Sequence, residues 1–154
     1  MPIGEKLYLM SEISGTITLN GQPAAGAKLK RIVSKAYSRS ELTDEAVTDA
    51  NGYFSMPAVT QRKFVQKIFP MEFVVPSVIF VTYQGKEYEI WNSTKRKPEE
   101  NTENRGKPLI VKCELTDDEQ GFMVDSSFFT TICTWNVEID PPFDPGLPIP
   151  DDEI

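Results

Sequence analysis

The chain has 154 residues, 40% hydrophobic and 25% charged, and its 16 basic and 23 acidic side chains give a net charge of -7 at pH 7. This length suits one domain that buries roughly two-thirds of the surface exposed by its unfolded form, without needing a metal or a disulfide to fold. The negative charge repels a phosphate backbone and argues against nucleic-acid binding, and no apolar run reaches the roughly 20 residues that a membrane-spanning helix needs.

The sequence contains no histidine, which excludes several classes of enzyme. Without imidazole there is no Ser-His or Cys-His nucleophile pair, no histidine-ligated zinc, and no side chain whose unperturbed pKa lies near neutrality. Carboxylate-pair hydrolysis and lysine nucleophiles remain formally possible, but no motif marks them. We therefore expect a protein that is not an enzyme and has no catalytic, cofactor-binding or metal-binding residues.

The first ten residues, MPIGEKLYLM, contain two charges and no continuous apolar core. They lack the pattern of a secretory signal, so we expect a cytoplasmic protein made without export through the Sec pathway. A periplasmic location is the alternative if a leader was removed from the chain.

Strands and turns are predicted from the start of the chain. Residues 12–19 alternate apolar and polar side chains with a period of two, as in a half-buried strand, and Asn20-Gly21 follows as a turn signal. An extended pattern resumes over residues 27–33, and the polar residues 34–41 predict a loop.

The next segment alternates between extended structure and a tight corner. Residues 45–48 lead into the turn Asp49-Ala50-Asn51-Gly52, and residues 53–56 lead out of it, with Gly52 able to adopt the positive φ that such a corner demands. Residues 60–69 carry apolar side chains at helical spacing, so they predict one short helical turn.

A hairpin and a polar loop are predicted in the middle of the chain. The most apolar run, residues 73–83, is followed by the turn Gln84-Gly85 and a second strand over residues 86–91. Residues 94–107 are almost wholly polar and charged, so they predict a solvated loop that is available for binding.

Two further strands are predicted over residues 109–115 and 128–137, separated by an acidic turn at 117–121, and we expect them to pair. The total is about seven or eight short strands with little helix. This pattern predicts an all-β fold, an antiparallel β-sandwich of the immunoglobulin or prealbumin kind, spanning residues 1–139.

The last 15 residues, DPPFDPGLPIPDDEI, hold five of the 12 prolines, five carboxylates including Asp140, and no basic residue. Proline at this density fits neither a sheet nor a helix, so residues 140–154 predict an extended or disordered tail. A disordered spacer is one interpretation. In the other, apolar side chains enter a groove of a partner while the carboxylates meet its basic residues. The candidate partner-binding residues are Phe143, Asp144, Leu147, Ile149, Asp151, Asp152 and Glu153.

Cys113 and Cys133 are the two cysteines of the sequence, and each lies in a predicted strand. Antiparallel pairing of these strands through a turn near Gly121 would bring the two thiols into register. In a cytosolic chain they are interpreted first as small core residues, with a disulfide as the alternative. We expect no metal site, because two thiols without histidine leave at least two ligands to be found among carboxylates.

Two motifs point to a known fold. The segments G.I.LNGQPAAGAKL and TDANGYFSMP resemble the opening and the hairpin of the carboxypeptidase-regulatory-like domain, a prealbumin-type (transthyretin-like) sandwich. Every matching residue has a structural reason to be present, such as a turn or a core position, so the resemblance implies a fold and not an active site. The matching positions are Gly15, Gly21, Pro23, Gly26, Ala27, Thr48, Asp49, Gly52 and Phe54.

A second resemblance covers most of residues 7–137. With LYLMSEISGTITLNGQPAAGA, VTYQGKEYEIWN, VKCELT and TTICTWNV, the chain looks like a family of small uncharacterised bacterial proteins often encoded near type VI secretion or polymorphic-toxin loci. This resemblance implies a non-enzymatic immunity or accessory protein whose partner is a toxin or effector. An acidic inhibitor suits that role, because complementary charge speeds the encounter with a basic cleft.

Two functions other than toxin binding are compatible with a sandwich of this kind. A structural or adhesion module, like the related sandwiches fused to larger surface proteins, is the alternative, although the missing export signal and the length of one domain argue against it. The transthyretin-like hydroxyisourate hydrolases share the topology but depend on histidines, which this sequence lacks.

Overall fold

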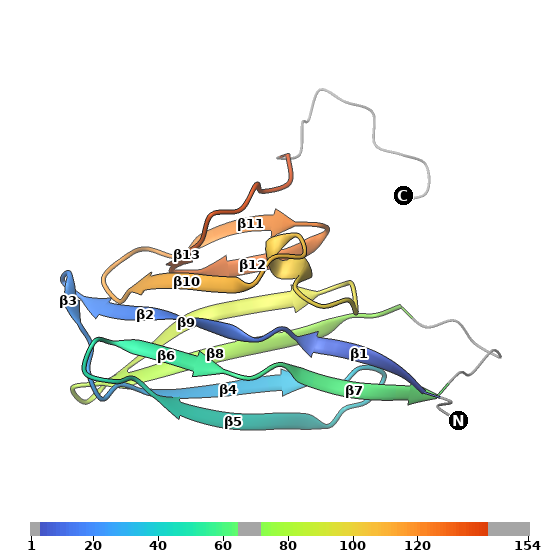
Figure 1. Cartoon of the computed structure of the whole chain (residues 1–154), viewed down its shortest axis with the longest axis horizontal. Helices are drawn as coiled ribbons and strands as arrows, with labels where there is room; N and C mark the ends of the chain where they lie inside the picture. Colours follow the sequence, from blue (N-terminus) through green and yellow to red (C-terminus); the bar gives the residue numbers. More distant parts are fainter. Residues whose placement is uncertain (1–3, 65–71, 142–154) are drawn as a thin grey trace.

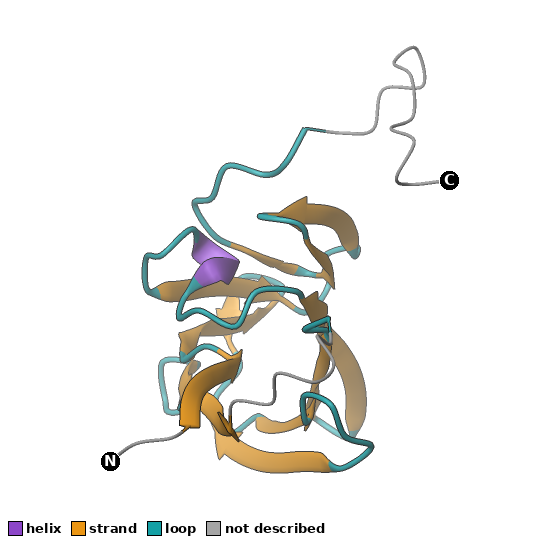
Figure 2. Cartoon of the chain, turned by 90° about the vertical axis from the view of Figure 1, so that its right-hand side faces the viewer, coloured by secondary structure: helices purple, strands orange, loops and turns teal. Residues whose placement is uncertain are grey.

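The computed structural model describes residues 4–64 and 72–141. These residues form thirteen strands and one 3-10 helix of three residues, η1 (Thr102–Asn104), arranged as a sandwich and not as a closed barrel (Figures 1 and 2). The predicted all-β sandwich with little helix is confirmed. There are more strands than the seven or eight expected. Two of the additional strands, Gln22–Pro23 and Cys133–Thr134, are too short to show an alternating pattern, and Gly4–Met10, Val59–Phe64 and Gln120–Val124 were not expected as strands.

The larger of the two main sheets has six strands, and all of its neighbouring pairs are antiparallel. The hairpin predicted around Gln84-Gly85 is confirmed at its centre, and the loop predicted after residue 34 joins two further neighbours. In order across the sheet the strands are β11 (Gln120–Val124), β12 (Ser127–Thr131), β9 (Lys86–Lys95), β8 (Val75–Tyr83), β4 (Lys28–Ser34) and β5 (Glu41–Val47).

The second sheet has five strands and includes a parallel pair that the sequence did not predict. β2 and β10 are parallel, with Ile13 opposite Leu109 and Ile17 opposite Cys113. The expected antiparallel pairing of β10 with the C-terminal segment is confirmed only at β13, because β12 belongs to the other sheet. The five strands are β13 (Cys133–Thr134), β10 (Leu109–Glu114), β2 (Ile13–Leu19), β3 (Gln22–Pro23) and β6 (Tyr53–Met56).

A two-stranded ribbon of β1 (Gly4–Met10) and β7 (Val59–Phe64) completes the fold. The helical turn predicted over residues 60–69 is wrong as far as Phe64, because this segment pairs antiparallel with β1. The rest of that prediction lies outside the described residues. Pairing with a distant strand overrides the helical spacing of the apolar side chains, as tertiary context commonly does for short segments.

The TDANGYF motif is a corner of the fold. The Asp49 carboxylate accepts hydrogen bonds from the backbone N–H groups of Asn51 and Tyr53, as an aspartate that caps its own turn should. Gly52 has φ 75°, and a Cβ there would lie 2.5 Å from the carbonyl oxygen of Ile17. Phe54 leads the chain back into the core with 1% of its surface exposed.

Glu114 fixes the turn in the other motif. Its carboxylate accepts hydrogen bonds from the backbone of Asn20 and Gly21, and from Thr18 and Thr116. Partial burial raises the pKa of Glu114, but the hydrogen bonds from Thr116, Gly21 and Thr18 outweigh it and lower this pKa from 4.5 to about 2. The end of β10 thus holds the β2–β3 turn in place.

Gly15 allows the parallel strands to approach each other. A Cβ added to Gly15 would lie 1.9 Å from the carbonyl oxygen of Val111, directly opposite on β10. We predict that Gly15→Ala lowers the free energy of unfolding by about 3 kcal/mol, at the upper end for overpacking, as measured by urea denaturation. The control is Gly121→Ala, whose Cβ would meet nothing closer than 3.8 Å. Equal denaturation midpoints for the two variants would contradict the close approach.

We predict that Glu114→Gln destabilises the protein by about 1–2 kcal/mol at pH 7, because the amide cannot accept the same hydrogen bonds. Since the folded pKa is depressed, the stabilisation from the carboxylate is complete above about pH 4.5 and is lost as the pH falls towards 2. The difference from the wild type in urea denaturation should therefore shrink by more than half at about pH 2.5. Glu119→Gln, which changes an exposed carboxylate nearby, is the control. A difference independent of pH would show that the hydrogen bonds do not depend on ionisation.

Candidate functional site

The segment predicted as a solvated loop, residues 94–107, is instead tied into the core. The Nζ of Lys95 lies 2.9 Å from the Oε1 of Glu103, and each side chain exposes only 2% of its surface. Lys95 also donates to the Glu99 carbonyl oxygen and to the Thr102 hydroxyl. The Glu103 carboxylate accepts hydrogen bonds from the backbone N–H and the hydroxyl of Ser11. The prediction of a solvated loop is therefore wrong for the centre of this segment.

This buried polar network has a structural role. Both charges are neutralised and hydrogen-bonded, as buried ions must be, and no binding group is left open. Every buried side-chain nitrogen and oxygen in the described residues has a hydrogen-bond partner. The network therefore explains how β9 and η1 are held together.

A second ion pair joins the buried Arg31 to the partly exposed Asp44, and both residues line a cavity of about 250 Å³ between β5 and the segment that joins β6 to β7. Arg31, which is fully buried, donates to both carboxylate oxygens of Asp44 and to the Pro57 carbonyl oxygen. β5 is an edge strand of its sheet, and an inward-pointing charge on an edge strand disfavours pairing with another chain. We interpret this pair as protection of the edge, so the cavity is not our candidate site.

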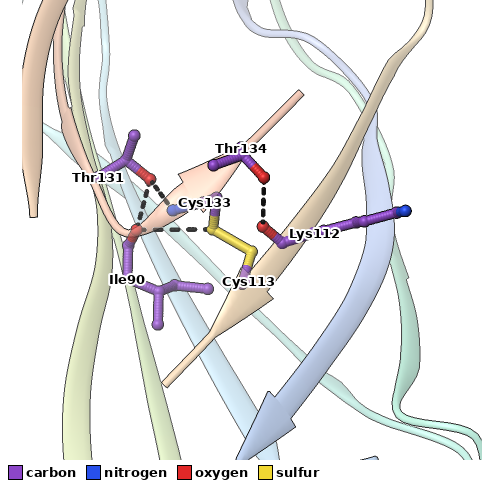
Figure 3. Close-up of a disulfide and its surroundings, with 6 residues drawn as sticks. All are labelled: Ile90, Lys112, Cys113, Thr131, Cys133 and Thr134. Carbon is purple, nitrogen blue, oxygen red and sulfur yellow. Dashed lines mark hydrogen bonds between the residues drawn. A yellow bond between two sulfur atoms is a disulfide. The ribbon is translucent and has the colours of Figure 1, made fainter. Parts of the chain in front are cut away.

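Cys113 and Cys133 form a disulfide (Figure 3). The pairing of β10 with β13 places them directly opposite each other, with a Cα–Cα distance of 4.1 Å. Both are almost completely buried. The interpretation as free core thiols is therefore wrong and the disulfide is the alternative that the structure supports, since the two strands meet in register.

The disulfide lies where the chain passes from one sheet to the other. Thr131 ends β12 in the six-stranded sheet, and Cys133 begins β13 in the other one. Between the two strands, the backbone N–H of Ile132 and the hydroxyl of Thr131 both donate to the Ile90 carbonyl oxygen. Residues 131–133, where the chain passes from one sheet to the other, are therefore held to β9 by hydrogen bonds and to β10 by a covalent bond.

The candidate partner-binding residues of the tail lie outside the described residues, but the start of the tail is well placed. The Asp140 carboxylate accepts hydrogen bonds from the backbone of Ser126 and Asp125 and from Arg105. The bond from Ser126 is the largest cause of the lowered pKa of Asp140, which burial opposes and the other two donors reinforce. Asp140 therefore belongs to the fold, and it is not a free carboxylate of the tail. The undescribed candidates are Phe143, Asp144, Leu147, Ile149, Asp151, Asp152 and Glu153.

Exposed apolar side chains gather where the tail begins. Met123 and Phe128 lie directly opposite each other on the outer surface of β11 and β12, with 42% and 50% of their surfaces exposed. Ile139, 51% exposed, lies near the same edge of β11, because the next residue donates its backbone N–H to the Met123 carbonyl oxygen. The Phe128 ring also extends over Gly121, where a Cβ would meet its Cζ atom at 3.8 Å.

This apolar pair is one end of a neutral band across the sheet, which we call the neutral face. Strand pairing places nine uncharged residues in two adjacent rows on the outer surface of β11, β12, β9, β8 and β4. A hollow of about 180 Å³ lies at the far end, and its lining includes Ile32, Pro76 and Val78 together with the charged side chain of Glu41, where the uncharged band ends. The neutral face consists of Met123, Phe128, Thr94 and Pro76 in one row and Gly121, Thr130, Asn92, Val78 and Ile32 in the other.

The sequence did not identify the neutral face, although one signal was present. Phe128 and Phe129 are adjacent in β12, and alternate residues of a strand point to opposite surfaces of a sheet, so one aromatic ring must face outwards. Phe129 is fully buried and contacts the rings of Trp91, Phe122 and Trp135. The outward position is left to Phe128.

Residues 13–118 match the family described as Domain of unknown function (DUF6795). The chain belongs to the DUF6795 family. The DUF6795 segment includes β2 to β10 and the Lys95–Glu103 pair, whereas Met123, Phe128 and the tail follow its end. Comparison with curated proteins and with solved structures finds no match.

Residues 4–64 and 72–141 contain neither a cluster of metal ligands nor a membrane-spanning helix. No three His, Cys, Asp or Glu side chains lie close enough together to hold a metal ion. No helix in this part of the chain has the length and hydropathy needed to cross a membrane. The candidate functional site is the neutral face, because it combines exposed apolar side chains with an uncharged surface.

We predict that replacing both cysteines by alanine lowers the free energy of unfolding by about 3 kcal/mol, because the disulfide closes a loop of 20 residues. Urea denaturation of the double variant and of the wild type measures this difference. Wild-type protein refolded in the presence of a reductant is the control and should show the same loss. An unchanged midpoint in the double variant would show that the disulfide adds no stability.

Proposed function

We propose that this member of the DUF6795 family is a non-enzymatic protein-binding domain that acts as an immunity or accessory protein of a bacterial toxin system such as type VI secretion. The observation that carries the protein-binding part is the neutral face. The toxin system comes from the resemblance to small bacterial proteins of such loci, and the experiments below test the two parts separately.

The composition of the neutral face favours a partner. An antiparallel sheet that meets water on one side normally carries polar and charged residues there. Five neighbouring strands instead present two uncharged rows, with Met123 and Phe128 among the most exposed apolar side chains of the described residues. Exposed aromatic and methionine side chains with few charges are typical of the centre of a protein interface.

The charge of the chain indicates what kind of partner would fit. The net charge is -7, and this total includes the carboxylates of Asp151, Asp152 and Glu153 near the end of the sequence. A partner with a basic surface around an apolar patch would be attracted by the charges and held by the apolar contacts. A toxin or effector with a basic active-site cleft has these properties.

The disulfide gives specific support to the alternative function, a structural or adhesion module. Disulfides persist in oxidising compartments and are rare among cytosolic proteins. The Cys113–Cys133 bond therefore favours a periplasmic or surface location over the cytoplasmic location expected from the first residues. Titration of free thiols in protein taken directly from native cells separates these locations: two free thiols per chain favour the cytoplasm, and none favours export.

We predict that Phe128→Asp weakens binding to the product of the neighbouring toxin gene by roughly 30-fold or more, the effect expected when an interface loses about 2 kcal/mol. The measurement is a binding titration with purified proteins, followed by a toxicity-rescue assay in cells. Ile110→Asp is the matched control, because Ile110 is 62% exposed on the other sheet and should leave affinity unchanged.

The two assays separate the parts of the proposal. Binding without rescue would support an accessory role over immunity. If Phe128→Asp and Ile110→Asp weaken binding equally, the effect is not specific to the neutral face, and its role in binding is contradicted. If the wild-type protein does not bind the toxin, the proposal of a toxin partner is contradicted, and a structural module would then be the better explanation.

A further inference from the structure

We propose that the hollow at the far end of the neutral face binds an arginine side chain of the protein partner, with the guanidinium group at the Glu41 carboxylate and the aliphatic carbons against Ile32 and Val78. This inference deepens the proposed function and rests on it for the existence of a partner. It assigns a binding site at the end of the face away from Met123 and Phe128.

The hollow combines apolar side chains with one carboxylate. Its volume is about 180 Å³, and Ile32, Pro76 and Val78 supply apolar surface. Of the described residues that line it, Glu41 alone carries a charge. Glu41 lies on the same outer surface, because it is opposite Ser34, which follows Ile32 by two residues on β4. A ligand in the hollow would therefore meet apolar carbon and a negative charge together.

The Glu41 carboxylate is available to a ligand. It is exposed, and the ion pairs and side-chain hydrogen bonds of residues 4–64 and 72–141 do not include it. Three cations of the β4–β5 hairpin are close to it in sequence or register, namely Lys30, Lys35 and Arg39, but none of them forms an ion pair with Glu41. The position beside the carboxylate is therefore open to a cation from a partner.

The other polar groups of the hollow suit a hydrogen-bond donor. Asn92 donates its amide N–H to the Glu89 carboxylate at 3.5 Å, which leaves the Asn92 carbonyl oxygen as an acceptor. Ser34 adds a hydroxyl, which can also accept. A guanidinium group has five N–H donors and no acceptor, so it matches this set. A carboxylate or phosphate ligand would instead be repelled by Glu41.

The apolar part of the hollow favours a basic group at the end of an aliphatic chain. Arginine and lysine lay their methylene carbons along apolar surface while the charged end stays in water. The guanidinium group of arginine is planar, forms two parallel hydrogen bonds with a carboxylate, and is more weakly hydrated than an ammonium group. Arginine is also enriched at protein interfaces, whereas lysine is depleted. The hollow therefore suits arginine better than lysine.

The distance between the two ends of the face constrains the partner. β12 and β4 are three strand spacings apart across the sheet, and each spacing is about 4.8 Å, so Phe128 lies roughly 14 Å from β4. A partner that contacts both ends must present an apolar patch and an arginine at about this separation. A basic surface without the apolar patch would match one end only.

Binding of n-butylguanidinium to the full-length protein tests the site without a toxin. We expect a titration with this probe to shift the NMR methyl peaks of Ile32 and Val78 and to leave those of Ile110, on the other sheet, unchanged. The guanidinium ion lacks the aliphatic carbons and n-butanol lacks the charge. Each should therefore bind roughly five-fold more weakly or worse.

Two matched variants locate the charge that the probe needs. Glu41→Gln should weaken binding of n-butylguanidinium roughly five-fold, at the upper end for an exposed ion pair. Glu45→Gln is the control, because it removes the same charge from the same strand and surface, but Glu45 lies opposite Lys30 and outside the lining of the hollow. Equal urea denaturation midpoints of both variants and the wild type would confirm that the fold is kept.

Three results of these titrations would overturn the proposal. They are the absence of methyl shifts with n-butylguanidinium, equal affinities of Glu41→Gln and the wild type, and binding of n-butylammonium as tight as that of n-butylguanidinium. The last result would show that the geometry of the guanidinium group has no role, and it would contradict the assignment to arginine.

Titrations of the same variants with the product of the neighbouring toxin gene separate this inference from the proposed function. If the toxin binds, Glu41→Gln should weaken its affinity roughly five-fold and Glu45→Gln should not. Equal affinities of the two variants would retain the function and overturn this inference. If the toxin does not bind but n-butylguanidinium binds at Glu41, the proposed function is lost and the binding site for an alkylguanidinium group is retained.

Discussion

A lysine and a glutamate buried together hold parts of the chain that no strand pairing joins. Lys95 ends β9 in the six-stranded sheet, while Glu103 in η1 binds Ser11 between β1 and β2. Trp135, near the C-terminal end of the fold, also donates its indole N–H to the Glu103 carbonyl oxygen. Removal of one partner of a buried pair leaves an uncompensated charge and typically costs about 3–5 kcal/mol. The relative position of both sheets therefore depends on this pair.

The scaffold and the proposed binding surface occupy largely different parts of the chain. The DUF6795 segment supplies most of the sandwich, including the buried Lys95–Glu103 pair and the Arg31–Asp44 pair. The residues after it add β11 to β13, the second cysteine and the exposed pair of Met123 and Phe128. A stable sandwich thus carries a C-terminal extension that completes both sheets at one side and places an apolar patch where the tail begins.

Local patterns in the sequence were informative where local contacts decide the structure. The alternation in β2 and the cap formed by Asp49 could be predicted, because each involves residues close together in the chain. The burial of Lys95 could not be predicted, because the sequence shows that a residue is charged but not which residue will pair with it. Its partner Glu103 is in turn held by Ser11, which lies 92 residues away in the sequence. The parallel pairing of β2 with β10 and the bonding of the cysteines depend equally on contacts distant in sequence. The neutral face depends on which of two adjacent phenylalanines faces inwards.

The disulfide also determines how a mechanical load would pass through the protein. A partner that holds residues 142–154 would pull on the chain from its C-terminal side. The covalent bond from Cys133 to Cys113 carries that tension directly into β10, which resists it in shear through its six residue pairs with β2. The residues between the two cysteines, with β11 and β12, form a closed loop that the tension bypasses. The hydrogen bonds that join Asp140 to Met123, Asp125 and Ser126 would take up the load first, and the disulfide would then stop the loss of structure at Cys133.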